Sequence, residues 1–180
     1  MIKYIFWGFF LLVLSPFSIL GQNKTINSDA NQKSININPA FIIGSELGAS
    51  IRMEYEKNHN KIMLNGLSGI YLKDGDFLML DLGLGYGHSV LKSASNTIFI
   101  NGFLTAMIQS MPMGAPPPSR FGPSGIIEIE YRKTWNNFSV NVVPYNRLFY
   151  SNGNLSDSNF NYSWGIKIGA MYSFRLKNHK

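Results

Sequence analysis

The chain has 180 residues, enough for one domain, and its charged and aromatic residues each make up 14 % of it. The formal net charge is +6, but Lys and Arg are scattered singly, which argues against nucleic-acid binding. The sequence contains no cysteine, which excludes disulfides, thiol nucleophiles and cysteine-ligated zinc, and we expect no cofactor. The 17 glycines and many aromatic residues favour strands and turns over helices.

The first residues predict export. Lys3 precedes an apolar run over residues 4–14, Pro16 interrupts the apolar character, and Gly21 is a small residue before a possible cut. The run is shorter than the roughly 20 residues of a spanning helix, which is the alternative interpretation. We therefore predict a signal peptide over residues 1–21, cleaved near Gly21.

Alternation of apolar and polar residues then identifies strands, because successive side chains of a strand point to opposite faces. The odd positions of 49–56 and 127–132 are apolar, as are most even positions of 77–89 and all of those in 160–176. In 160–176 the aromatic residues stand at both ends and the aliphatic residues in the middle. That order is typical of a strand that faces a membrane.

Less regular segments bring the expected strands to eight, in the ranges 33–43, 49–56, 61–73, 77–89, 97–109, 127–132, 138–150 and 160–176. Connections near 58–60 and 135–137 are short, whereas those at 111–124 and 151–159 are long, as in outer-membrane barrels. We also expect a turn over 89–96. The pattern predicts an all-β protein, with a transmembrane antiparallel barrel over 33–176, a flexible lead-in over 22–32 and a tail over 177–180.

An eight-stranded barrel has a lumen just wide enough for side chains, so we expect a filled, polar lumen and no pore. Charges of both signs on the inward positions should pair there, since a lone buried charge is costly. The predicted lumen ion network consists of Arg52, Glu54, Glu56, Asp81, Glu128, Glu130, Arg132 and Lys167, with Arg175 also expected inside.

Over most of 33–176 the chain resembles the small eight-stranded outer-membrane proteins of Gram-negative bacteria. Segment 167–174 is similar to the terminal-strand signal that the barrel assembly machinery reads in such proteins, with Gly169, Tyr172 and Phe174 at the signal positions. Six residues follow Phe174, whereas such barrels commonly end at the aromatic residue. The resemblance implies a bacterial outer-membrane location, contact with outer-membrane lipid and assembly by that machinery.

A fainter similarity is to the lipid A palmitoyltransferase barrels. Pro123 and Pro144 flank the hairpin of the sixth and seventh strands, where prolines of that family open a lateral path for lipid. Asp74 falls in a comparable place but is followed by Gly75, where the family has Ser. The resemblance implies an acyl-modifying enzyme as an alternative function.

The segment 111–124 is the most distinctive expected loop, since its prolines stiffen an extended chain that binds a partner at little entropic cost. Its candidate contact residues are Pro112, Pro116, Pro117, Pro118, Arg120 and Phe121. The alternative is a stiff loop that only resists proteolysis.

No residue is predicted to be catalytic or to bind a metal. Asp81 and Ser89 should point inward and His88 outward, so these three residues cannot form a simple hydrolytic triad. Glu128 and Glu130 lie about 6.6–6.8 Å apart along one face, but a structural ion network explains them better than paired-carboxylate catalysis.

The first hypothesis is therefore a non-enzymatic barrel that reinforces the membrane or contacts a surface partner. The second is a lipid A acyl-modifying enzyme. The third is a secreted soluble barrel that binds an apolar ligand, in which the two faces of every strand would be reversed.

Overall fold

The computed structural model describes residues 33–72, 77–110, 120–150 and 160–176. They form eight strands: β1 (Lys33–Gly44), β2 (Glu46–Lys57), β3 (Asn60–Tyr71), β4 (Phe77–Lys92), β5 (Asn96–Ser110), β6 (Arg120–Trp135), β7 (Phe138–Tyr150) and β8 (Phe160–Leu176). Within these ranges no helix is long and apolar enough to cross a membrane. The predicted signal peptide 1–21, lead-in 22–32 and tail 177–180 lie outside the described residues.

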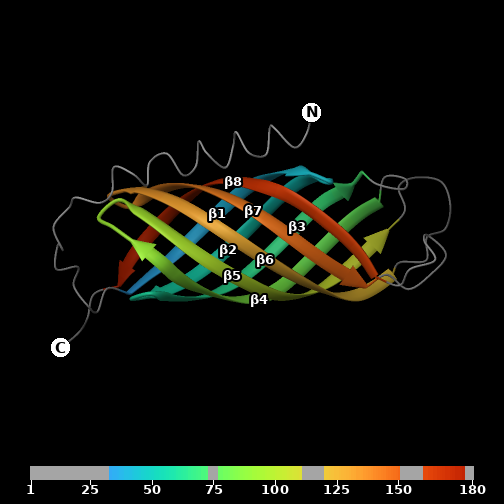
Figure 1. Ribbon diagram of the computed structural model, residues 1–180, viewed down its shortest axis with the longest axis horizontal. Helices are drawn as coiled ribbons and strands as arrows, with labels where there is room; N and C mark the ends of the chain where they lie inside the picture. Colours follow the sequence, from blue (N-terminus) through green and yellow to red (C-terminus); the bar gives the residue numbers. More distant parts are fainter. Residues whose placement is uncertain (1–32, 73–76, 111–119, 151–159, 177–180) are drawn as a thin grey trace.

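The strands form one closed antiparallel barrel in which each strand pairs with its neighbours in sequence. Closure comes from the pairing of β1 with β8, whose register runs from Lys33 opposite Leu176 to Gly44 opposite Gly165. The strands run obliquely to the long axis, as closure of a sheet requires (Figure 1). The predicted all-β, eight-stranded barrel is confirmed.

Three short turns lie at one end of the barrel, which we call the short-turn end. They are centred on Asn58–His59, Ser93–Ser95 and Asn136–Asn137. Asn58 and Asn136 adopt φ angles of 59° and 53°, a left-handed conformation that asparagine tolerates better than most residues. The turn expected over 89–96 is shorter than predicted, because β4 continues to Lys92 through a β-bulge between Ser89 and Leu91.

At the opposite end, β1 and β2 are joined by Ser45 alone, and we call this the Ser45 end. Ser45 is held from both sides: its N–H donates to Trp164 O at 2.9 Å, and its carbonyl accepts from Leu72 N at 3.0 Å. Strand β6 begins at Arg120, so the predicted loop 111–124 is too long at its C-terminal side. The proline-rich composition suggested a loop up to residue 124. Pro123 is nevertheless compatible with β6, because it faces outward.

Inward and outward positions follow the alternation of the sequence. On β4, Asp81, Gly83 and Ser89 are buried, whereas the alternate leucines and Tyr86 are exposed. The soluble-barrel hypothesis required the reverse, with the leucine row lining a cavity, and is wrong in this respect. Arg175 was also misplaced: it is exposed at the end of β8 and donates to Asn136 O.

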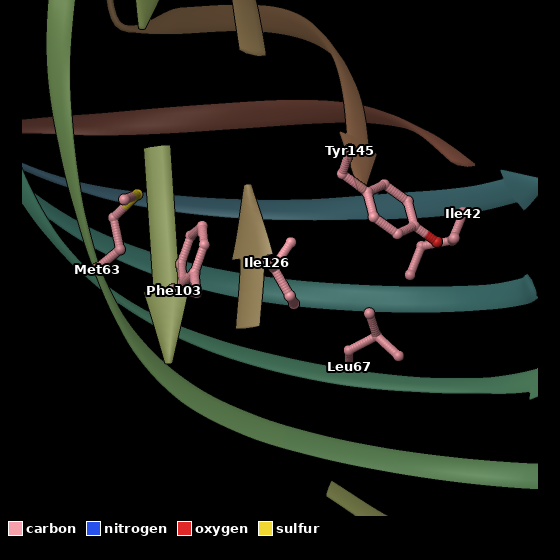
Figure 2. Close-up of a cluster of buried hydrophobic side chains, with 6 residues drawn as sticks. All are labelled: Ile42, Met63, Leu67, Phe103, Ile126 and Tyr145. Atoms are coloured by element: carbon pink, nitrogen blue, oxygen red, sulfur yellow. The ribbon is translucent and has the colours of Figure 1, made fainter. Parts of the chain in front are cut away.

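The interior is filled by apolar as well as polar side chains. Figure 2 shows a central cluster contributed by five strands, with Tyr145 beside Ile42 and with Phe103 between Met63 and Ile126. A second apolar cluster closes the Ser45 end and consists of Tyr71, Met79, Met107 and Phe149. The expected polar lumen therefore includes apolar layers, contributed largely by segments whose alternation is irregular.

The glycine row of β4 makes room for these inward side chains. A β-carbon at Gly85 would overlap the ring of Phe103, and one at Gly87 would meet Asn101 and the stem of Lys61. Gly85 stands opposite Phe103 and Gly87 opposite Asn101 in the β4–β5 register. The glycines thus allow the large side chains of neighbouring strands to enter a narrow lumen.

Candidate functional site

The outer surface of the barrel is an apolar belt. Leu104 is 81 % exposed, Leu84 and Ile127 are each 66 % exposed, and every strand contributes large apolar side chains to this surface. Monomeric soluble proteins rarely expose an apolar surface of this extent. The belt is therefore a candidate surface for contact with lipid hydrocarbon.

Aromatic residues flank the belt at both ends. Toward the Ser45 end the exposed rings are Phe41, Phe121, Phe160, Tyr162 and Trp164. Toward the short-turn end they are Tyr55, Tyr86, Trp135, Phe138, Tyr172 and Phe174. Amphipathic rings favour the two interfaces of a bilayer, so their separation by an aliphatic zone is the arrangement of a transmembrane barrel.

A buried ion network fills the lumen toward the short-turn end, with Arg52 at its centre. Arg52 Nη2 lies 2.5 Å from Glu128 Oε2, and Nη1 lies 3.2 Å from Glu130 Oε2 and 3.6 Å from Glu54 Oε1. The side chains of these four residues are at most 3 % exposed. Each carboxylate therefore depends on protein cations to replace the water that it has lost.

Three further cations complete the network. Arg132 contacts Glu54 at 2.6 Å, Glu56 at 2.7 Å and Glu130 at 2.6 Å. Lys61 Nζ lies 2.5 Å from Glu130 and 3.2 Å from Glu54, while Lys167 Nζ lies 2.5 Å from Glu128. At the rim, Lys92 pairs with Glu56 at 3.2 Å and is 30 % exposed.

Buried aromatic rings, among them Phe99 and Phe103, face these cations. The Lys61 Nζ and Arg132 Cζ atoms lie 4.1 Å and 4.7 Å from the centroid of Phe99. Arg52 Cζ lies 5.0 Å from the centroid of Phe103. Cation–π attraction strengthens in such desolvated surroundings, so both rings help to hold the cations in the lumen.

A smaller polar group lies nearer the Ser45 end and is centred on Glu46. This carboxylate accepts hydrogen bonds from Arg147 at 3.0 Å, Tyr145 at 3.2 Å and Ser163 at 2.5 Å. Arg147 Nη2 also lies 3.3 Å from Asp81 Oδ2. The structure thus places Asp81 with Arg147, separately from the other predicted network residues.

The other seven predicted residues lie together, but three charged lumen residues were missed. Lys61, Arg147 and Glu46 are each at most 1 % exposed and form ion pairs. Lys61 and Arg147 lie in segments of irregular alternation. The residues on either side of each are exposed, so strict alternation of inward and outward side chains would have placed both inside. Glu46 directly follows the Ser45 connection, where the sequence shows no strand signal.

The remaining predicted positions are distributed as follows. Gly169 faces inward beside Asn38 and Asn141, whereas Tyr172 and Phe174 face outward with ring centroids 4.9 Å apart. Asp74 and the four prolines of the predicted contact loop, Pro112, Pro116, Pro117 and Pro118, lie outside the described residues. Arg120 and Phe121 belong to β6 instead of a loop, and Phe121 is 70 % exposed.

Asp81, Ser89 and His88, the three residues considered as a hydrolytic triad, are kept apart. Asp81 pairs with Arg147, Ser89 Oγ lies 2.8 Å from His59 Nδ1, and His88 faces outward with Nδ1 at 2.8 Å from Asn60 Oδ1. Among the described residues, no group of three or more His, Cys, Asp or Glu side chains is arranged to hold a metal ion.

No protein-family model matches the sequence, and no curated protein matches it. The fold, however, has close counterparts among solved structures. Neisserial surface protein A aligns with a TM-score of 0.60 at 12 % identity, over 81 % of this chain and 98 % of its own. The fold is that of a small outer-membrane β-barrel. The N-terminal β-barrel domain of Pseudomonas aeruginosa OprF aligns with a TM-score of 0.56 at 13 % identity, over 80 % of this chain and 99 % of that one.

Proposed function

We propose that this protein is a non-enzymatic barrel of a bacterial outer membrane that reinforces the membrane or presents a surface to a partner. The observation that carries the proposal is the aliphatic belt between two aromatic zones, which surrounds a lumen closed by paired charges. The belt suits lipid hydrocarbon, whereas water would make its exposure costly. The candidate surface for a partner is the region 111–124.

Migration on gels tests the membrane placement. The folded chain in detergent micelles should migrate differently before and after boiling, because a closed barrel resists dissociation of its strands by detergent alone. Protein that stays soluble and monomeric without detergent would contradict a lipid-facing belt.

Ion conductance tests the closed lumen. Arg52, Lys61 and Arg132 tie strands β2, β3 and β6 together across the barrel axis, so an ion path requires at least one buried pair to open. We expect no sustained single-channel steps in planar bilayers. Reproducible large steps from the unmodified chain would contradict the proposal that the lumen is closed.

We further propose that Gly169, Tyr172 and Phe174 form a signal for the barrel assembly machinery and that residues 1–21 direct export. Tyr172→Ala or Phe174→Ala should lower the yield of assembled barrel in cells more than Leu176→Ala, although all three side chains face outward. Equal yields from the three variants would contradict this role.

One observation sustains a second candidate, the lipid A acyl-modifying enzyme. The β6–β7 pairing is interrupted between Glu128–Tyr145 and Tyr131–Val142, beside the outward-facing Pro144, which has no N–H to donate. Pro123 lies within continuous β5–β6 pairing. If the barrel is non-enzymatic, its expression in a bacterium without lipid A acyl-modifying enzymes should leave the lipid A mass spectrum unchanged. A mass shift of one acyl chain that Asp74→Asn abolishes would favour the acyl-modifying enzyme.

A further inference from the structure

Two histidines that are distant in sequence meet at the short-turn end. His59 lies in the β2–β3 turn and His88 on the outward face of β4, and the register places Asn60 directly opposite His88. The two rings are exposed and their centroids lie 6.3 Å apart. Neither the lumen network nor the proposed function uses them.

Hydrogen bonding leaves one nitrogen of His88 free. Its Nδ1 atom lies 2.8 Å from Asn60 Oδ1, which also accepts a hydrogen bond from the Tyr86 hydroxyl at 2.6 Å. Since a carboxamide oxygen only accepts, His88 Nδ1 must carry the proton. The lone pair of this imidazole then lies on Nε2, the nitrogen available to a ligand.

His59 is held in a similar way. Its Nδ1 lies 2.8 Å from Ser89 Oγ, and the N–H of Ser89 donates to the carbonyl of His59, also at 2.8 Å. In the tautomer in which Nδ1 donates its proton to the hydroxyl oxygen, Nε2 is again the free atom. The β-bulge of β4 directly follows Ser89. Such bulges are common beside functional positions.

We propose that His59 and His88 form a binding site for a late divalent transition metal such as Zn²⁺, Ni²⁺ or Cu²⁺, with water as the remaining ligands. Imidazole nitrogen suits these ions, and ligating histidines commonly donate their other N–H to a fixed acceptor. Asn60 Oδ1 is such an acceptor for His88, and the Ser89 hydroxyl can accept from His59 in the same way. The site does not depend on the proposed membrane role.

The separation of the rings fits one shared ion. A metal about 2.0–2.1 Å from each nitrogen lies about 3 Å from each ring centre, so two rings on one ion have centres about 5–6 Å apart. The observed 6.3 Å needs only a small side-chain rotation, which exposed rings can make.

Lys92 and Glu56, two charged groups on this rim, are already engaged. Lys92 Nζ contacts Glu56 Oε1 at 3.2 Å and the carbonyl of Asn58 at 2.9 Å, while Glu56 Oε2 pairs with Arg132 at 2.7 Å. This cation and this carboxylate thus satisfy each other. The two histidines remain as the donors for a metal.

Calorimetric titration with Zn²⁺ of the untagged chain in detergent micelles tests the site. Every sample carries His179→Gln, which removes the third histidine from the comparison. We expect one Zn²⁺ per chain, and His59→Gln and His88→Gln should each weaken binding at least about tenfold, to the level of the double variant. Asn60→Ala should weaken it about tenfold and reduce the Zn²⁺-induced shift of the His88 Nε2 resonance in nitrogen NMR.

Two outcomes would overturn the proposal. One is a single-histidine variant that retains the affinity of the parent, which would mean that the rings do not share an ion. The other is a stoichiometry of two with one site lost in each single variant. Unchanged migration of unboiled variants on gels will show that the barrel is intact in each sample.

Discussion

The two halves of the lumen are filled by different kinds of contact. Toward the short-turn end, four cations meet four carboxylates: Arg52, Lys61, Arg132 and Lys167 with Glu54, Glu56, Glu128 and Glu130. Toward the Ser45 end lie the four apolar side chains of the second cluster together with the Glu46–Arg147 pair.

This difference predicts how far the effect of a substitution should extend in each half. A buried charge is stable only while its partners remain, so the loss of one network residue affects several others. An apolar cluster loses contacts roughly in proportion to the atoms removed. Substitutions in the two halves should therefore differ in size and in how far they extend.

The largest effect is expected for Arg132→Met. Its removal leaves Glu54 and Glu130 buried with too few cations, which should lower the free energy of unfolding by about 3–5 kcal/mol. Denaturant titration in detergent measures this loss. The matched control, Lys92→Met, removes a partly exposed partner of Glu56 and should cost only about 0–1 kcal/mol. Equal losses from the two variants would mean that Glu54 and Glu130 are hydrated.

Met107→Ala in the apolar half should cost about 2–5 kcal/mol, because Met107 is 1 % exposed and its truncation opens a cavity among Tyr71, Met79 and Phe149. Leu104→Ala on the same strand is the control, since that side chain is 81 % exposed on the outer belt. The same denaturant titration should give the smaller loss for Leu104→Ala. The reverse order would place Met107 outside the packed interior.

The smallest effect is expected for a substitution in the glycine row of β4. Gly85→Ala forces a β-carbon against the ring of Phe103 and should cost about 1–3 kcal/mol by overpacking. Gly102→Ala is the control, because a β-carbon there meets nothing within 4 Å. If thermal unfolding in detergent shows the same midpoint for both variants, the Phe103 ring moves aside without cost.

Strand number and face were predictable from the chain. The parity of 49–56, 77–89 and 160–176 correctly assigned the inward positions of Arg52, Asp81 and Lys167. Prediction was weaker where the period-two signal fades. Lys61 was missed because its strand carries apolar residues such as Met63 and Leu67 on the inner face as well.

The partners within the lumen were not predictable in the same way. Asp81 shares a face with the network residues but pairs with Arg147 on β7, and two strands of the sequence, β5 and β6, lie between them. Parity says which side of a sheet a residue occupies, not how far along the barrel axis it lies. That height depends on the stagger accumulated between strands as the barrel closes.

By itself, the sequence determined which residues face inward and which face outward over most of the regularly alternating strands, because alternation along a strand is a local consequence of backbone geometry. Only the tertiary structure decided which inward charges meet, that Gly85 lies against Phe103, and that His59 lies beside His88. These contacts depend on the register of strands that are joined by turns and on the closure of β1 against β8, and neither is encoded in the period of any single segment.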